Sequence, residues 1–442
     1  MPGGAYRLDE LGWLQFQELC AAVVEQDTGR GEASWRGTAD ARRDALVPDG
    51  LPGRLKGPTL ASVIWLRHQI PPERRRAACL GLLDGVRDGF QARARDGTRP
   101  ASLLLMANAA DLLDDEMLLG MVSDLVPAVA VVGIPELSER LDESPELRRR
   151  FPAALGTTDL ARLLPAPARA ASSFDRRAAH ALAPVFVATR AYQRAAASLE
   201  SHGFVVLTGP PEVGKTAIAQ MLALVQVTDG WEAHDCRDPD ELLGHYRAGA
   251  PQIFLADDAF GSTEYRPDTA ERWARELDRV LARMDETHWL VWTSRPAPLA
   301  AGLRRVHRER GLERFPDPGS VQVDASRLSV EEKVLILFRH ARAAGLDPDQ
   351  RRFVQVTGDA IVAHRYFTPE RVRRLVGEIG GSVPRDRDWL DDALRDPTAA
   401  MRTSLAALDD EHRDLLVALL DAPPSWVSER ELAHALRSHH PG

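Results

Sequence analysis

The sequence has little cysteine, no long apolar run and no excess of positive charge. Its three cysteines, Cys20, Cys79 and Cys236, lie far apart and form no C-x-x-C pair. This spacing excludes a disulfide framework and a cysteine-based structural zinc site. No apolar stretch reaches the length of a bilayer, and none lies near the start, so we expect a cytoplasmic protein with no membrane contact. The formal net charge of −9 excludes wholesale coating of nucleic acid, so any DNA contact needs a local basic patch.

The remaining composition is that of an ordinary globular protein. Hydrophobic residues make up 44% of the sequence and charged residues 27%. At 442 residues the chain is long enough for two to four domains, each with a core of its own. Strand-like apolar runs alternate with helix-period segments until about residue 323, where the pattern becomes helical only. We therefore expect an α/β fold followed by an all-helical part.

The first domain is expected to span residues 1–165. Apolar runs at 60–66, 101–107 and 128–132 predict buried strands, and residues 112–125 predict a helix between the last two of these strands. An opening helix precedes them, because apolar residues recur there at helical spacing. The alternation indicates an α/β domain.

Two short helices are expected near the end of this domain. The segment 135–151 is rich in charge, so we predict surface helices, with Ser144 as an N-cap and Pro145 as the first helical residue. Beyond it, Pro165 and Pro167 begin an Ala/Ser tract of linker composition. The sequence places the domain boundary there.

The most informative stretch is residues 204–224, where an apolar strand is followed by a Gly- and Pro-containing loop and then a helix. Its GPPEVGKT segment fits the pattern G-x-x-x-x-G-K-[ST], in which glycines let backbone N–H groups surround a phosphate at a helix N-terminus. Lys215 is placed to reach the outer phosphates, and Thr216 to offer a hydroxyl to Mg²⁺. The predicted loop residues are Gly209, Pro210, Pro211, Glu212, Val213, Gly214, Lys215, Thr216 and Ala217.

Two further apolar strands end in polar residues. The segment 252–258 (QIFLADD) ends in Asp257, a candidate Mg²⁺ ligand, and Asp258, a candidate for orienting the attacking water. The strand at 289–292 runs into TSR, whose Thr293, Ser294 and Arg295 are positioned to sense a terminal phosphate. Because ligands of open α/β sheets bind at the carboxyl ends of the strands, all three segments predict one site. Asp258 and Arg295 are its candidate catalytic residues.

The rest of the chain divides into three predicted parts. Residues 174–324 form the nucleotide-binding core and 325–383 a helical lid, which opens with a capping-box spacing of Ser329 and Glu332. Residues 384–442 resemble the start of a winged-helix domain, and a simple helical hairpin is an equal alternative.

The first domain resembles the Mrr-type restriction-endonuclease-like domains. That family places an Asp ahead of a Glu or Gln and a Lys, the last two standing two residues apart on the next strand. Here GTADARRDAL supplies Asp40 and Asp44, with Asp44 at the catalytic position, but Trp65 and Arg67 stand where the last two groups belong. An indole cannot ligate Mg²⁺, and a guanidinium cannot serve as a proton donor. The resemblance implies nucleic acid as a partner, and both an active nuclease and a catalytically degenerate domain remain open.

The order of motifs in residues 174–380 is similar to that of the third group of novel STAND NTPases. It consists of GPPEVGKT, FLADDAFG, WTSR, an all-helical lid and an H-x-x-F-x-P-E-R segment, whose fixed residues are His364, Phe367, Pro369 and Arg371. One departure is Glu212, where such loops commonly carry Gly; we expect its side chain to point into solvent.

This resemblance implies a molecular switch. The cofactors would be ATP or ADP with Mg²⁺, and Val187, Thr189 and Pro369 would contact the nucleotide. Such proteins self-associate on activation by a trigger or sensor partner, which the sequence does not name, and many bacterial members act against phages. No repeat array follows before Gly442, so we expect either a piece of a longer chain or sensing through another subunit.

A second class of function remains open. An AAA+ type ATP-dependent DNA loader or transcriptional regulator would need a basic C-terminal face. The segment SERELAHALRSHH offers Arg430, Arg437 and its histidines for that role.

Overall fold

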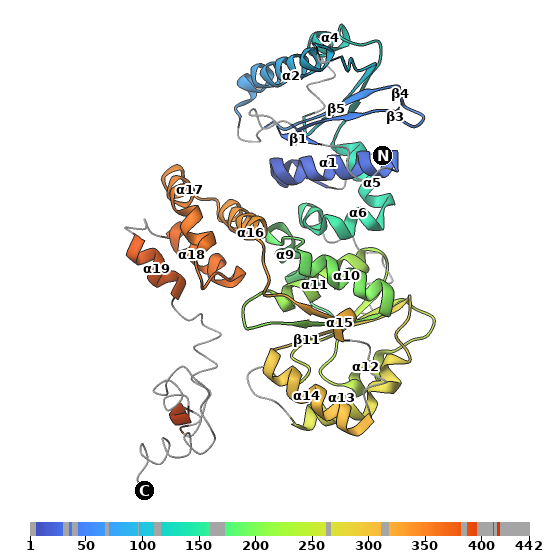
Figure 1. Cartoon of the computed structure of the whole chain (residues 1–442), viewed down its shortest axis with the longest axis vertical. Coiled ribbons are helices and arrows are strands. Elements are labelled where there is room, and N and C mark those ends of the chain that lie inside the picture. The colour runs from blue at the N-terminus through green and yellow to red at the C-terminus, as the bar shows by residue number, and fades with distance from the viewer. Residues whose placement is uncertain are drawn as a thin grey trace.

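The protein is described by a computed structural model that consists of three parts (Figure 1). The structure describes residues 6–29, 35–37, 43–66, 70–95, 97–109, 116–159, 173–261, 267–310, 318–381, 387–395, 410 and 413–415. An N-terminal α/β part and a second α/β part follow one another along the long axis, and a helical part lies beside them. Within these residues no helix is long and apolar enough to cross a membrane.

The N-terminal sheet has the order β1-β2-β5-β6-β7. Its strands are β1 (Arg36–Gly37), β2 (Arg43–Val47), β5 (Thr59–Ile64), β6 (Ser102–Ala107) and β7 (Val129–Val132). The first three pair antiparallel and the last three parallel. All residues of β5 and β6 are buried, because helices cover both faces of the sheet.

Helix α1 (Trp13–Thr28) lies on the face turned toward the second part, and α2 (Pro72–Arg95) and α4 (Glu116–Ser123) lie on the other. A small hairpin of β3 (Gly50–Leu51) and β4 (Leu55–Lys56) extends from the sheet edge. The three strands and two helices predicted for this domain are confirmed, whereas β2 and the long α2 were not predicted.

The second sheet is all parallel, with the order β12-β8-β11-β10-β9. Its strands are β8 (Phe204–Thr208), β9 (Glu232–Asp235), β10 (Gln252–Ala256), β11 (His288–Ser294) and β12 (Gln322–Asp324). Helices α9 (Arg176–Leu182), α10 (Arg190–His202) and α11 (Lys215–Thr228) cover the face toward the N-terminal part, and α12 (Pro239–His245), α13 (Pro267–Leu281) and α14 (Pro296–Arg310) cover the other. The order puts β11 between the phosphate-loop strand and the strand that ends at the two aspartates.

The face covered by α13 and α14 is packed by aromatic rings. Trp292 of β11 is fully buried, and its ring meets those of Trp273, Phe260 and Phe204 edge-on at centroid distances of 4.9, 5.1 and 5.2 Å. Edge-to-face packing stabilises such clusters beyond the area they bury. It holds β11 firmly beneath the polar residues that follow it.

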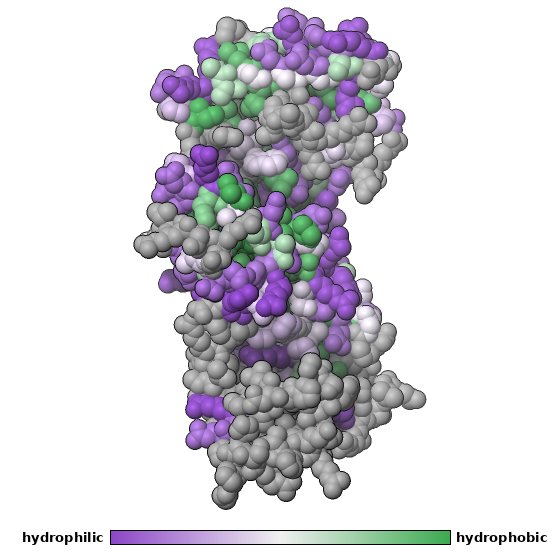
Figure 2. Space-filling model, turned by 60° about the vertical axis from the view of Figure 1, so that its left-hand side comes forward, coloured by the Kyte–Doolittle hydropathy of each residue, from purple (hydrophilic) through white to green (hydrophobic). Residues whose placement is uncertain are grey.

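The helical part consists of α16 (Val330–Ala343), α17 (Pro348–Ala363), α18 (Pro369–Gly381) and α19 (Arg387–Arg395), preceded by the single-turn α15 (Pro318–Val321). The predicted capping box is present: Ser329 accepts from the N–H of Glu332, and Glu332 accepts from the N–H of Ser329. On the face shown in Figure 2, apolar side chains gather over this lid within a charged surround; exposed ones include Val334, Phe338 and Val356. Most of the predicted winged-helix segment lies outside the described residues.

Helices α5 (Ile134–Glu143) and α6 (Pro145–Arg150), followed by the 3₁₀ turn η2 (Pro152–Thr157), join the two α/β parts. Ser144 caps α6 and Pro145 opens it, as predicted. The predicted surface location holds for one side of each helix, where Glu139, Glu143 and Glu146 are exposed. On the other side, Leu137, Leu141 and Leu147 are buried in the core that continues from the N-terminal part into the second part. Charge hid this apolar face in the sequence. The predicted linker around Pro165 lies outside the described residues.

Arg148 is the charged residue at the centre of this junction. Its guanidinium pairs with Asp229, which follows α11, and donates to the carbonyls of Leu141 at 2.5 Å and Asp142 at 2.6 Å. The side chains of Arg148 and Asp229 are only 9% and 12% exposed. Burial raises the pKa of Asp229 and Arg148 opposes that shift. Each charge therefore needs the other.

Replacing Arg148 by Ala should strongly destabilise the junction, because Asp229 would be left buried without its partner. We expect a loss of about 3 kcal/mol or more, seen as a lower urea midpoint by circular dichroism. Arg149→Ala is a matched control: Arg149 pairs with Glu200 at 3.3 Å in an exposed setting, where a salt bridge is worth less than about 1 kcal/mol. Equal losses in the two variants would contradict this account.

Candidate nucleotide-binding site

The phosphate loop runs from the end of β8 to the first residue of α11. Gly209 has φ +145° and Gly214, the N-cap of α11, has φ +95°, both strained for residues with a Cβ. The first N–H groups of a helix have no partner within it. The 14-residue α11 therefore presents free donors and its partial positive charge to the space enclosed by the loop.

Lys215 lies inside the curve of this loop. It is 8% exposed, and its ammonium donates to the carbonyls of Gly209 at 2.9 Å and Pro210 at 2.8 Å. Burial lowers the pKa of Lys215, and Arg295 adds to this; the carboxylates of Asp258 and Asp257 oppose it. The groups predicted at the ends of β10 and β11, namely Asp257, Asp258 and Arg295, are thus close enough to Lys215 to change its pKa. All four side chains belong to one site.

Thr216 and Asp257 meet at the edge of the sheet. The hydroxyl of Thr216 donates to Asp257 Oδ1 at 3.2 Å and Oδ2 at 3.3 Å. Among the described residues no cluster of three or more His, Cys, Asp or Glu side chains is arranged to hold a metal. Mg²⁺ usually takes one or two protein oxygens and completes its shell with water and phosphate oxygens. The hydroxyl–carboxylate pair fits that donor set.

Thr293 has a different role from the predicted one. It is 1% exposed; its hydroxyl donates to Asp257 Oδ1 and accepts from the N–H of Asp258 at 2.9 Å. Ser294 is also buried and donates to the carbonyl of Arg295 at 3.2 Å. Both hydroxyls are committed to the protein, so the prediction that they sense a terminal phosphate is wrong. Thr293 instead positions the two aspartates.

Asp258 and Arg295 are left as the groups able to face the terminal phosphate. Asp258 lies in a tight turn, with φ +48° and its carbonyl accepting from the N–H of Gly261 at 2.8 Å. Such backbone strain is often found where a side chain must be aimed at a ligand. Arg295 follows β11 directly and is half-buried.

The side chain of Glu212 was expected to point into solvent because of its position in the loop. This prediction is wrong. The side chain is 4% exposed, with Oε2 3.7 Å from Nε of Arg371 on α18. Burial raises the pKa of Glu212, and Arg371 is the main opposing influence. Arg371 also donates to the carbonyl of Leu394 at 2.5 Å. A buried ion pair therefore joins the phosphate loop to the lid.

A small pocket lies beside the first turn of α11. It is lined by Gly214 and Ala217 of the loop and helix, by Val187 and Thr189 of the segment before α10, and by Pro369 of the lid. The Cγ of Pro369 lies 4.0 Å from the place a Cβ on Gly214 would take. All five were predicted to contact the nucleotide. Sequence reasoning missed His340, a further lining residue on α16.

The parallel sheet, the phosphate loop and the carboxylate pair define a P-loop NTPase. Residues 186–343 match the family described as Novel STAND NTPase 3. This match and the site support the assignment of this part of the chain to the STAND class of P-loop NTPases. Among curated proteins none matches the sequence.

Three solved structures are similar at low identity. A Walker-type ATPase of Pyrococcus abyssi is 15% identical, with a TM-score of 0.36, and the match covers 57% of this chain and 88% of that chain. The FIGL-1 AAA domain in complex with ADP is 18% identical (TM-score 0.29, 61% and 89%), and C. elegans PCH-2 is 11% identical (0.21, 56% and 66%). With TM-scores this low, the class assignment rests on the family match and the site.

Thr293→Val removes the hydroxyl that holds both aspartates and keeps the shape of the side chain. Because partners behind a metal ligand typically contribute 10–100-fold to metal affinity, we expect Mg²⁺-dependent nucleotide binding to weaken by about tenfold or more. Titration of Mg²⁺ against the chain with fluorescent ADP measures this. Thr287→Val, at the opposite end of β11, is the control; an unchanged Mg²⁺ midpoint in Thr293→Val would remove the proposed role.

Proposed function

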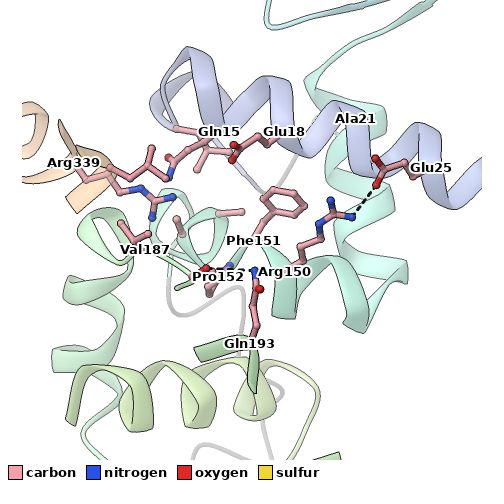
Figure 3. Close-up of a pocket in the computed structure, with 15 residues that line it drawn as sticks. Gln15, Glu18, Ala21, Glu25, Arg150, Phe151, Pro152, Val187, Gln193 and Arg339 are labelled. Atoms are coloured by element: carbon pink, nitrogen blue, oxygen red, sulfur yellow. Dashed lines mark hydrogen bonds and ion pairs between the residues drawn. The ribbon is translucent and has the colours of Figure 1, made fainter. Parts of the chain in front are cut away.

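We propose that this chain is a nucleotide-controlled switch, which binds ATP or ADP with Mg²⁺ between its core and its lid and passes the nucleotide state to the N-terminal domain. The observation that carries the proposal is a meeting point of all three parts. A cavity of about 330 Å³ is lined by α1, by the segment 150–154 with Val187 and Ala188, and by Leu335 and Arg339 of α16 (Figure 3).

Arg339 reaches from the lid toward α1 across this cavity (Figure 3). With its amide oxygen facing the guanidinium, Gln15 accepts hydrogen bonds from Arg339 and donates to the carbonyl of Leu11 at 2.5 Å. Burial lowers the pKa of Arg339 to about 10, and the nearby carboxylate of Glu18 opposes the shift. A buried guanidinium is costly without such partners. The contact that holds the lid on α1 should therefore be either fully formed or broken.

A second arginine crosses the same boundary. Arg342 lies against Gly12 at the start of α1, where an added Cβ would come within 1.9 Å of Nη1, and φ is +91°. Burial lowers the pKa of Arg342, opposed by Glu10 and Asp9. The φ of +91° favours glycine at this position, whereas the flexible Arg342 side chain could shift away from an added Cβ.

The same lid helix also touches the core near the nucleotide pocket. Glu332, in the first turn of α16, accepts from the N–H of Arg190, the first residue of α10, at 2.5 Å. Val187 lines both the small pocket and the three-part cavity. A shift of α16 driven by the nucleotide would thus be felt at α1 directly, as a packed two-state element requires.

Hydrolysis would use Asp258 to orient the attacking water and Arg295 to stabilise charge on the terminal phosphate, with Mg²⁺ neutralising the phosphates when bound. We propose slow turnover, because a switch needs long-lived nucleotide states. Self-association after a trigger, and a role in bacterial defence against phages, complete the proposal by resemblance to the family. A fast basal ATPase would favour the loader class instead.

The N-terminal domain would be the effector, with a degenerate nuclease site. Asp44 is 5% exposed and accepts from the hydroxyl of Ser62 at 2.5 Å. The ring of Trp65, in the position of a metal-binding Glu or Gln, packs on Phe16 of α1 at 5.3 Å. These contacts support a packing role. Asp40 and Arg67 lie outside the described residues.

The test of nucleotide binding is Lys215→Ala. We expect ATP and ADP binding to be lost in calorimetry, because the loop loses its buried cation. Arg194→Ala, an exposed change on α10, should bind normally. Asp258→Asn should keep affinity and lose turnover, since Asp258 acts on the attacking water. Unchanged affinity in Lys215→Ala would contradict the assignment of the site.

Arg339→Met tests the coupling, because it keeps an unbranched aliphatic stem and removes the guanidinium that contacts α1. We expect ADP release to quicken about tenfold and self-association to begin at lower protein concentration, in the usual range of coupling energies. Stopped-flow release of fluorescent ADP and sedimentation velocity measure the two effects. Arg352→Ala, an exposed change on α17, is the control. If Arg339→Met releases ADP and self-associates like the wild type, the lid and the N-terminal domain are not coupled through this contact.

Asp44→Ala tests the effector domain in the full chain. Because the carboxylate is buried and bonded across the sheet, we expect the free energy of unfolding in urea to fall by about 1–3 kcal/mol. We expect no nicking of supercoiled plasmid with Mg²⁺ or Mn²⁺ before or after the change. Nicking by the wild-type chain that disappears in Asp44→Ala would show an active metal site instead.

A further inference from the structure

The small pocket beside the phosphate loop has an unusual lining. Among the described residues that line it, Thr189 and His340 alone carry polar side chains; the others are apolar or glycine. The hydroxyl of Thr189 already accepts from the N–H of Tyr192 at 3.3 Å as the N-cap of α10. An apolar pocket with one or two polar groups is typical of a site that fixes the orientation of a flat ligand.

His340 enters this pocket from the lid. It lies one turn after Ile336 on α16, and both line the pocket with Pro369. No described residue forms a hydrogen bond to its ring nitrogens. Burial and the positive charge of Arg373 lower the pKa of His340 to about 4, with Glu370 opposing. At neutral pH the imidazole is therefore uncharged, with one donor and one acceptor.

We infer that His340 hydrogen-bonds the edge of the purine base when the nucleotide is bound, which makes it a base-contacting residue of the lid. The inference rests on the proposed function, since it requires the diphosphate to lie in the loop between Gly209 and Thr216. A base one ribose away from the first turn of α11 would lie near Ala217 and Pro369, which both line the pocket.

The chemistry of the two partners agrees. Adenine offers an amino donor on C6 with a ring acceptor on either side, N1 or N7, so each edge presents one donor and one acceptor. A neutral imidazole can pair with either group by choice of tautomer. The apolar side chains of Val187, Ala217 and Pro369 would face the ring itself. Removing a partner from such a buried pair leaves a polar group without a bond.

The position of His340 on α16 would link the base to the N-terminal domain. The next residue back along α16 is Arg339, which faces Gln15 and Glu18 of α1. One helix would thus hold the base with one residue and the N-terminal domain with its neighbour. A hydrogen bond from the base to His340 would fix the position of this part of α16, and with it the position of Arg339.

The test is a set of binding measurements on the full chain with ADP and three analogues, each lacking one edge group. Purine riboside diphosphate lacks the amino group, 1-deaza-ADP lacks N1 and 7-deaza-ADP lacks N7. The wild-type chain should bind at least one analogue about tenfold more weakly than ADP, because a buried hydrogen bond is lost. His340→Leu should bind ADP and that analogue equally, and His340→Gln should recover part of the preference.

Two controls separate the inference from the proposed function. His202→Leu, an exposed change at the end of α10, should keep the wild-type preferences, and Lys215→Ala should lose ADP and every analogue. If His340→Leu and His340→Gln keep each preference of the wild type, or if the wild type shows no preference, the inference is overturned while the nucleotide site stands. If the wild type binds neither ADP nor any analogue, the proposed function fails and the inference with it.

Discussion

Placement of the half-buried Arg339 between the lid and the N-terminal domain is the constraint on which the arrangement of the three parts depends. A charge taken out of water needs partners in fixed places, and here the amide oxygen of Gln15 accepts its hydrogen bonds while the carboxylate of Glu18 on α1 offsets its charge. The lid cannot move far from α1 without leaving this group unpaired. Packed interfaces of this kind have discrete arrangements and not a continuous range of them.

A second connection between the nucleotide site and the N-terminal part runs through α11, the helix that follows the phosphate loop. Helix α11 begins at Lys215 and is followed by Asp229, which pairs with Arg148 of α6. The nucleotide site and the junction with the N-terminal domain are therefore opposite ends of one rigid element. Glu212 and Arg371 join the same loop to α18. One ion pair thus joins the phosphate loop to the lid, and another joins the far end of α11 to the N-terminal part, which makes α11 and its loop the hub of the proposed switch.

Much of the site could be predicted from the sequence because its residues are contiguous. The loop residues, Asp257 and Asp258 occupy fixed spacings at strand ends, and the parallel sheet brings them together as expected. Thr293 could be assigned correctly only once β11 was known to lie beside β10, since its partner belongs to another strand. Glu212 and His340 depend on the placement of the lid, which no local pattern encodes. The partners of the inner face of the charged helices around Arg148 depend on long-range placement in the same way.

The central claim is that the nucleotide and the N-terminal domain are coupled through α16, and hydrogen–deuterium exchange on the unmodified chain tests it most directly. Peptides from α1, α16 and α11 would be compared with ADP and with a slowly hydrolysed ATP analogue, each with Mg²⁺. Coupling through α16 predicts that exchange in α1 and α16 changes together when one nucleotide replaces the other, because contacts between them link the two helices. A change confined to α11 and the phosphate loop, with α1 and α16 equally protected in both states, would contradict it.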